Sequence, residues 1–316
     1  MIRHFGRAGL IGAANSKFKG KYMRALLKIA LFLLTYCGVC FEGMSQTLQV
    51  TYFPTAESKD DTRFDYATQL LDKALEKTVK SDGPFTMTPG GKMNVGRAFQ
   101  FLEEGRIVNV GWSTPTQERE ENFIPIRIPI KKGLLGYRIF LIKQQDRDKF
   151  ASIQTLKELK KLKVGQGHIW NDVKVFKANG FKIVTGPEYE GLFDMLIAGR
   201  FDYFSRGINE APNEYEERKG RLYDLYMEET ILLYYPWPKY FFTSKKTPQL
   251  AERIERGLRM MIKDGSFEAH FMKFHKKDIE RVNLNERKLF KIHNPLLPLT
   301  APVDQKELWF DPFEEH

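Results

Sequence analysis

Strand-like and helix-like segments alternate through most of this chain, and that alternation constrains its fold more than any other feature. Strand-like runs at Leu48–Phe53, Phe85–Thr88 and Arg106–Trp112 are separated by two stretches in which apolar residues recur at helical spacing. Residues 163–204 repeat the pattern with three more strand-like runs and two helical stretches. Strands that alternate with helices of this length are typical of α/β units with largely parallel sheets. Two such sets predict two lobes.

Two extended stretches are predicted to carry the chain between the lobes. Phe123–Lys143 contains two prolines and two glycines, and Ile231–Thr243 is rich in β-forming residues and contains two prolines. Because there are two crossings, we expect the first lobe to be completed by chain returning from the second. A helical stripe from Leu250 to Ile262 then predicts a closing helix. The predicted division is a signal peptide (1–45), the first part of lobe 1 (46–130), lobe 2 (131–235), the return to lobe 1 (236–276) and a C-terminal extension (277–316).

The N-terminus has the pattern of a secretion signal. A basic stretch, Met23–Lys28, precedes the apolar run Ile29–Cys40. A bilayer-spanning helix needs roughly 20 apolar residues, so this run has the size of a signal-peptide core. Gly43 and Ser45 are small residues at the positions that cleavage before Gln46 requires. We predict a cleaved signal and a periplasmic location; an uncleaved anchor is the alternative, and the start at Met1 or Met23 is open.

The mature chain lacks cysteine, because Cys37 and Cys40 both lie in the signal. It therefore has no disulfide, no thiolate metal site and no cysteine nucleophile. Of the net charge of +10, +6 lies in the first 45 residues, and the rest predicts no nucleic-acid partner. We find no catalytic motif and no histidine spacing typical of a metal site. The sequence predicts a binding protein without cofactor, metal or catalytic residues.

Three segments carry a resemblance to a known family. The block Leu156–Asp202 contains "LKEL", "KVG" and "LIAGRFD" in order; "TQER" (116–119) precedes the first crossing, and "DGSF" (264–267) follows the closing helix. In these segments the chain resembles the bacterial periplasmic solute-binding proteins of the type II fold, the group with the polar amino-acid receptors of ABC importers. The resemblance implies a two-lobed α/β fold, each lobe a mixed, mostly parallel sheet flanked by helices, with two hinge crossings.

The chain departs from the family pattern at one position. Amino-acid receptors of this group have a carboxylate about four residues after "GR-x-D", where it holds the ammonium group of the ligand. Here that place is taken by Arg206. A cation would repel an ammonium group, so the departure favours an anionic ligand. Arg119 occupies the family's carboxylate-binding place, and we expect it to hold the anion together with Arg206.

Other residues are weaker candidates. Gly167 and His168 lie in a strand-to-helix turn whose backbone N–H groups could meet an anion, although an ordinary tight turn is as good an explanation. Trp170, Tyr52 and Phe53 could stack on a ligand or belong to the core. Arg127 and Arg138 lie on the first crossing. Its stretch Ile124–Ile130 alternates, so Ile126, Ile128 and Ile130 should face one way and Arg127 the other, toward the cleft or plain solvent. Asp60, Asp61 and Arg63 lie in the first strand-to-helix loop, where helix capping by Asp61 is expected. The predicted ligand-binding set is Arg119, Arg206, Thr114, Thr116, Gly167, His168, Trp170, Tyr52, Phe53 and Arg138.

The sequence thus predicts a receptor that captures a small, anionic ligand by hinge closure and then meets an ABC permease or a membrane sensor. An enzyme on the same fold, such as a dehydratase acting on a small carboxylic acid, is the alternative, and a ligand-free interaction protein is a third. The proline-rich, apolar tail after residue 294 is expected to form an extended strap on the first lobe or on a neighbouring subunit.

Overall fold

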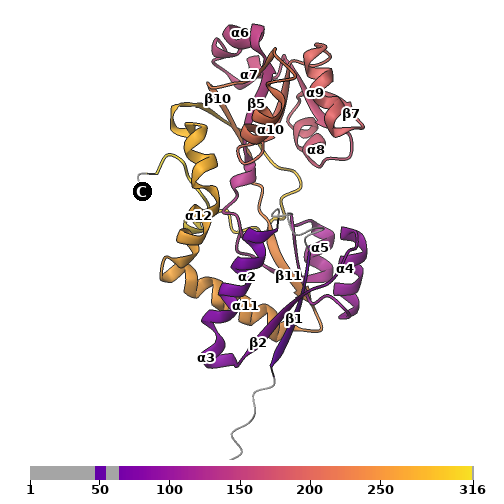
Figure 1. The fold of residues 1–316 in the computed structure, drawn as a ribbon, viewed down its shortest axis with the longest axis vertical. Coiled ribbons are helices and arrows are strands. Elements are labelled where there is room, and N and C mark those ends of the chain that lie inside the picture. The colour runs from indigo at the N-terminus through magenta and orange to yellow at the C-terminus, as the bar shows by residue number, and fades with distance from the viewer. Residues whose placement is uncertain (1–46, 55–63, 315–316) are drawn as a thin grey trace, which may run out of the picture. The chain divides into compact units, whose positions relative to one another are not determined.

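The computed structural model describes residues 47–54 and 64–314. The predicted signal peptide, and the loop that contains Asp60, Asp61 and Arg63, lie outside the described residues. The described chain contains two β-sheets, each flanked by helices (Figure 1). Within it, no helix has both the length and the apolar character needed to cross a membrane.

The first sheet is mixed, with the order β2-β1-β3-β11-β4. Strand β1 pairs in parallel with β2 and β3, whereas β11 pairs antiparallel with β3 and β4. The strands are β1 (Leu48–Phe53), β2 (Phe85–Pro89), β3 (Val110–Ser113), β4 (Phe123–Ile126) and β11 (Tyr240–Ser244). The helices connected with this sheet are α2 (Asp65–Lys77), α3 (Val79–Asp82), α4 (Val95–Glu104), α5 (Gln117–Asn122), α11 (Pro248–Lys263) and α12 (Ser266–Arg281).

The second sheet has the order β12-β10-β5-β8-β6-β7, and β9 pairs with β5. Its strands are β5 (Tyr137–Lys143), β6 (Lys163–Gly167), β7 (Lys182–Gly186), β8 (Tyr203–Gly207), β9 (Leu225–Met227), β10 (Ile231–Tyr234) and β12 (Lys288–Lys291). Its helices are α6 (Arg147–Ala151), α7 (Leu156–Leu159), α8 (Asp172–Ala178), α9 (Tyr189–Ile197) and α10 (Ala211–Arg218). This sheet is also mixed, with the parallel ladder β8-β6-β7 that the alternation of strands and helices predicts.

All antiparallel pairings in the two sheets involve β5 or β11. Each of these two strands enters its sheet through a crossing that contains no α-helix, whereas β12, which pairs in parallel, follows α12. They have no crossover helix on their own sheet before them, and a crossover connection is what parallel pairing of consecutive strands requires. The chain passes from β4 to β5 and returns from β10 to β11, within the two predicted extended stretches.

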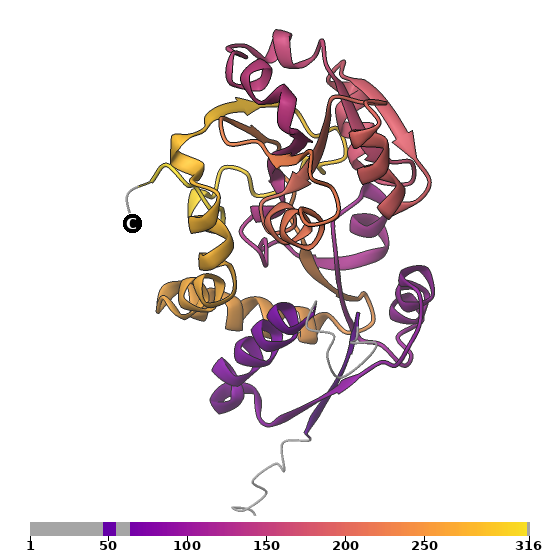
Figure 2. The ribbon, with the colours of Figure 1, turned by 45° about the horizontal axis from the view of Figure 1, so that its top comes forward.

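Helix α2 packs against α11 at a very close approach (Figure 2). The buried residues of α2 recur at helical spacing and cover the first sheet. On the α11 side, Gly257 faces the backbone of Ala74, and a Cβ at residue 257 would lie 1.9 Å from the Ala74 carbonyl oxygen. Only glycine permits the two helix backbones to come this close.

The structure differs from the sequence prediction in the connection from α4 to β3. The predicted strand Arg106–Trp112 begins only at Val110. Gly105 ends α4 in the left-handed region, with φ at 65°, and Ile107 is also left-handed, with φ at 58° and 54% of its surface exposed. Residues 106–109 therefore form a turn, because the chain must reverse between the end of the helix and the start of the strand.

The C-terminal part of the chain makes a third passage between the sheets. After α11 comes a further helix, α12, beside α2 and α11, and the chain then forms β12 in the second sheet, parallel to β10. This strand precedes residue 294, so it lies outside the segment predicted to form a strap, and it was not predicted from the sequence. A four-residue run carries too little periodicity to assign a sheet, whereas the free edge of β10 offers a backbone ladder for it to join.

The rest of the tail packs on the first crossing. The backbone N–H of Phe310 donates to the Lys132 carbonyl at 2.8 Å, and the Tyr137 hydroxyl donates to the Phe310 carbonyl at 2.8 Å. The indole ring of Trp309 covers Gly133, where a Cβ would come within 2.5 Å of the ring. The tail is thus anchored to the fold by a few buried side chains, among them Leu308 and Phe310, and residues 282–314 contain no α-helix.

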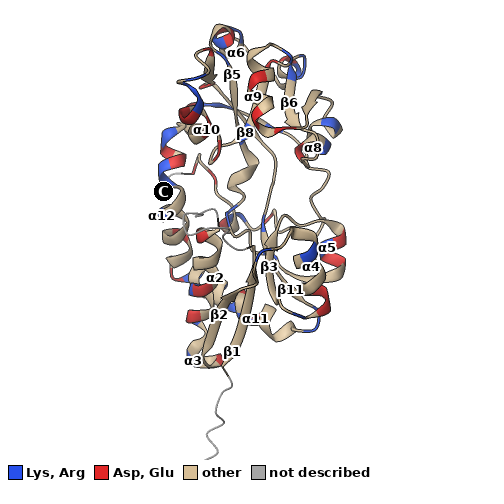
Figure 3. Ribbon diagram, turned by 45° about the vertical axis from the view of Figure 1, so that its right-hand side comes forward, with Lys and Arg blue, Asp and Glu red and all other residues tan. Residues whose placement is uncertain are grey.

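Charged side chains of both signs are interspersed along the helices (Figure 3). On α12, for example, Lys276 pairs with Glu280 and Arg281 pairs with Glu216 of α10. In the described residues, the basic side chains thus alternate with acidic ones on these helices, which is typical of a solvated surface and not of a nucleic-acid-binding face.

Candidate functional site

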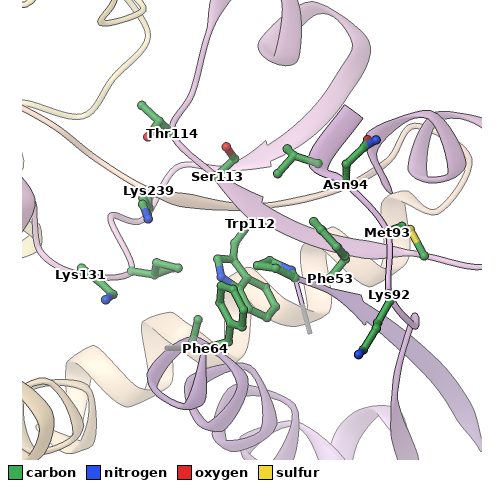
Figure 4. Close-up of a pocket in the computed structure, with 14 residues that line it drawn as sticks. Phe53, Phe64, Lys92, Met93, Asn94, Trp112, Ser113, Thr114, Lys131 and Lys239 are labelled. Carbon is green, nitrogen blue, oxygen red and sulfur yellow. The ribbon is translucent and has the colours of Figure 1, made fainter. Parts of the chain in front are cut away.

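A pocket of about 860 Å³ opens at the carboxyl ends of β1 and β3 (Figure 4). Ligands of open α/β sheets bind at this edge of the sheet. The lining comes from these strand ends, from the N-terminal parts of α2 and α4, and from both crossings. It consists of Phe53, Pro54, Phe64, Ala67, Lys92, Met93, Asn94, Val95, Trp112, Ser113, Thr114, Ile130, Lys131 and Lys239.

Trp112 forms the aromatic wall of this pocket. Its ring stacks on Tyr52 with centroids 6.1 Å apart and planes 21° apart, and it meets Phe241 edge-on at 5.9 Å. Phe64, from the turn before α2, packs against it at 6.5 Å. Because the ring is held on several sides and is only 7% exposed, its position is defined before any ligand binds.

Two lysines stand where the crossings run side by side. The backbone N–H of Ile130 donates to the Lys239 carbonyl at 2.9 Å, which joins the two crossings and brings Lys131 and Lys239 to the same end of the pocket (Figure 4). Both are half-buried. Neither ammonium group forms an ion pair with any residue that the structure describes; Lys131 lies over the Tyr66 ring at 5.4 Å.

Burial perturbs both lysines. Desolvation, strengthened by the charge of Lys239, lowers the pKa of Lys131 to about 8, against the opposing effect of Glu210 and Asp278. Desolvation likewise lowers the pKa of Lys239. Sequence reasoning missed these lysines. The signal was that each is embedded in a proline-containing, apolar stretch, where an ordinary surface lysine is not expected.

Arg119 lies behind the pocket wall. Thr116 caps α5 by accepting the Arg119 N–H at 3.2 Å, and the guanidinium donates to the Thr114 carbonyl at 2.8 Å while lying 4.8 Å from the Phe99 ring centroid. Burial lowers the pKa of Arg119. Thr114 lines the pocket and Arg119 supports it, and within the described chain Arg119 forms no ion pair. Its role as a ligand residue stays a prediction.

Arg206 already has partners in its own chain. Its guanidinium is 8% exposed and makes a two-pronged ion pair with Glu214, with Nε–Oε2 at 2.8 Å and Nη2–Oε1 at 2.6 Å. Glu210 lies 3.3 Å from Nη2, and the Trp170 ring stacks below at 4.8 Å. Although burial opposes it, the carboxylates raise the pKa of Arg206. Glu214 and Glu210 therefore already neutralise the charge of Arg206. No ligand anion is needed to offset its repulsion from Arg119.

The remaining predicted residues of the second lobe lie outside the lining of this pocket. Arg138 is 3% exposed and pairs with Asp172 at 2.7 Å. Trp170 stacks on Phe204 at 6.0 Å and covers Gly167, where a Cβ would lie 2.5 Å from the indole. His168 is exposed. Of the predicted residues, Phe53 and Thr114 line the pocket, and Tyr52 contacts it through Trp112.

Arg127, the outward-facing residue of the first crossing, is a structural residue. It donates to Glu120 at 2.7 Å, while Ile126, Ile128 and Ile130 on the opposite side are buried. The alternation predicted for this stretch is confirmed. In the described residues, no group of three or more His, Cys, Asp or Glu side chains is placed to hold a metal ion.

No protein-family profile and no curated protein sequence matches this chain. Solved structures match its fold. A probable amino-acid ABC transporter extracellular-binding protein from Bacillus subtilis is 16% identical, with 74% of this chain and 100% of that chain covered and a TM-score of 0.53. YckB from Bacillus subtilis is 18% identical, with 78% and 96% covered and a TM-score of 0.52. An ancestral arginine-binding protein bound to arginine is 21% identical, with 72% and 97% covered and a TM-score of 0.45.

At these identities the likeness establishes the fold. The chain has the two-lobed fold of the type II periplasmic binding proteins, as the sequence resemblance implied.

Proposed function

We propose that this chain is an exported solute-binding receptor that captures a small, anionic ligand by closure of its two lobes. The observation that carries the proposal is the pocket at the crossings. Three lysines and no described aspartate or glutamate line it. A mostly apolar pocket with a few convergent charged groups is the usual form of a small-molecule site, and the excess of cations selects negative charge.

The fold supports binding as the output. The structurally similar Bacillus subtilis protein is described as an extracellular-binding protein of an amino-acid ABC transporter. In this chain the two crossings between β4 and β5 and between β10 and β11 are the natural hinges, because they are short and are joined to each other by only a few backbone hydrogen bonds, among them Ile130 to Lys239. Closure would present a surface to an ABC permease or to a membrane sensor.

The ligand role of Arg119 fits the same pocket. Thr114 and Thr116 hold the arginine at the wall, so a ligand that reaches past Thr114 would meet its guanidinium. Arg119 has no carboxylate partner among the described residues, so its guanidinium is able to donate hydrogen bonds to a carboxylate of the ligand. Arg206, paired with Glu214 and Glu210, would contribute only if closure rearranged those pairs.

The decisive experiment is native mass spectrometry of protein purified from the periplasm, followed by scattering with the retained ligand. We expect a small acid in the pocket and a smaller radius of gyration when it is bound. Terminal sequencing of the same sample should find Gln46 first. A protein that retains no ligand and shows no thermal shift with a broad panel of metabolites would overturn the proposal, and turnover of the bound acid would indicate an enzyme instead.

A further inference from the structure

The two hinge lysines, Lys131 and Lys239, form a charged end of the pocket, and neither has an ion-pair partner among the described residues. Lys131 belongs to the first crossing and Lys239 to the second, and the hydrogen bond from Ile130 to Lys239 keeps the crossings adjacent at this point. Both side chains are half-buried in the lining. The charge of Lys239 acts against the charged form of Lys131 in these partly desolvated surroundings, and an anion between the two would offset that repulsion.

The acid whose charge acts on both lysines is already committed to other cations. Glu210, before α10, lies 3.6 Å from Arg138 and 3.3 Å from Arg206, and one of its oxygens accepts the Gly207 N–H at 2.9 Å. The Glu210 carboxylate acts electrostatically on both lysines, but it forms an ion pair with neither. Asp278 of α12 also acts on Lys131, again without an ion pair. The hinge lysines therefore have no paired carboxylate among the described residues, and a ligand can supply one.

Aromatic side chains line the pocket beside the hinge lysines. Trp112 presents the middle of the wall, with Phe53 and Phe64 beside it, and Figure 4 shows the indole between the hinge lysines and Lys92. Aromatic side chains with fixed rings bind planar groups by offset stacking. No described acid lines the pocket to receive an ammonium group.

We infer that the pocket binds an organic anion with a planar, apolar body, whose acidic group lies between Lys131 and Lys239 and whose body packs on Trp112. This rests on the proposed receptor function and makes its ligand class specific. Because one lysine comes from each crossing, the same anion that fills the pocket also ties the two crossings together. The charge of the ligand then favours the closed form, in addition to the contacts that the ligand makes with the lobes.

The test is calorimetry with simple probes. Phenylacetate and indole-3-acetate are the acids, phenylacetamide and phenethylamine are the matched neutral and cationic analogues, and hexanoate is the non-aromatic acid. We expect the aromatic acids to bind at least tenfold more tightly than the amide, the amine and hexanoate. Lys131→Gln and Lys239→Gln should each weaken binding of the acids by roughly 30-fold or more, the usual range for a buried charge pair.

Matched variants separate charge from folding. Lys131→Arg and Lys239→Arg should keep most of the affinity, and Lys157→Gln, an exposed lysine of α7, should leave it within about threefold of wild type. Trp112→Leu should remove the preference for aromatic acids over hexanoate. If a ligand found by mass spectrometry binds the Gln variants as tightly as wild type, this inference is wrong and the receptor function stands. If no compound of any class binds, both are wrong.

Discussion

The backbone N–H of Ile130 donates to the carbonyl oxygen of Lys239 at 2.9 Å, and this bond joins the two segments that lead from one sheet to the other. Just beside it, the side chains of Lys131 and Lys239 enter the pocket. The point about which the lobes are proposed to turn is therefore also the point at which a ligand charge is proposed to bind. Ligand recognition and hinge closure would then be one event.

The first prediction concerns pH. An anion stabilises the protonated form of Lys131. When the pH is above the Lys131 pKa of about 8, Lys131 must therefore take up a proton as the anion binds. Affinity for phenylacetate should therefore be constant below pH 7 and fall as the pH rises through 8, by at most roughly tenfold per pH unit. The charged and titratable groups facing Lys131 are Lys239, Glu210, Asp278 and His275.

Calorimetry between pH 6 and 9.5 checks this prediction, with the buffer ionisation heat varied to count protons. Lys131→Arg serves as the control, because its guanidinium stays protonated over this range. An affinity that does not change between pH 7 and 9.5 would contradict the assignment of the anion to Lys131.

The second prediction concerns the Arg206–Glu214 pair. Glu214→Gln removes a buried carboxylate and leaves the guanidinium partly uncompensated, so the free energy of unfolding should fall by about 3 kcal/mol. Urea denaturation measures it. Arg200→Ala, an exposed arginine of the same lobe without an ion pair among the described residues, should change stability by less than about 0.5 kcal/mol. Equal stabilities of the two variants would show that the pair is not structural.

The third prediction concerns the tail. Phe310 is 3% exposed and packs on Phe271 and Tyr137, so Phe310→Ala should cost about 3 kcal/mol, and deleting Asn294–His316 should cost more. Differential scanning calorimetry gives the change in Tm. Leu299→Ala is the control, since Leu299 is fully exposed and should be neutral. An unchanged Tm and oligomeric state after the deletion would refute a structural role for the tail.

The fourth prediction concerns the contact between α2 and α11. Gly257→Ala would place its Cβ 1.9 Å from the Ala74 carbonyl oxygen, and the helices would have to separate. We expect a loss of about 3 kcal/mol in urea denaturation. Gly220→Ala, where a Cβ meets no atom within 4 Å, should be nearly neutral and serves as the matched control. Comparable effects at the two positions would mean that the helices are not packed as described.

Local patterns in the sequence determined the elements that position the site. Apolar residues at helical spacing in residues 64–75 and 95–102 give α2 and α4, and the alternation through Ile126, Ile128 and Ile130 gives the buried side of the first crossing. Periodicity reports which side of a segment is buried, because a buried face must be apolar along its whole length. The order of strands and helices follows from that signal, and the proline-containing extended stretches indicated the two crossings.

Pairings between distant segments were decided by the tertiary structure alone. The sequence around Arg206 does not show whether this arginine binds a ligand or pairs with an acid of its own chain. The structure pairs it with Glu214 of α10. The meeting of Lys131 with Lys239, more than a hundred residues apart, depends on how the crossings pair, and β12 depends on which sheet edge is free. Ion-pair and hydrogen-bond partners depend on which residues lie close together in the folded chain. Periodicity along the sequence does not indicate which distant residues these are.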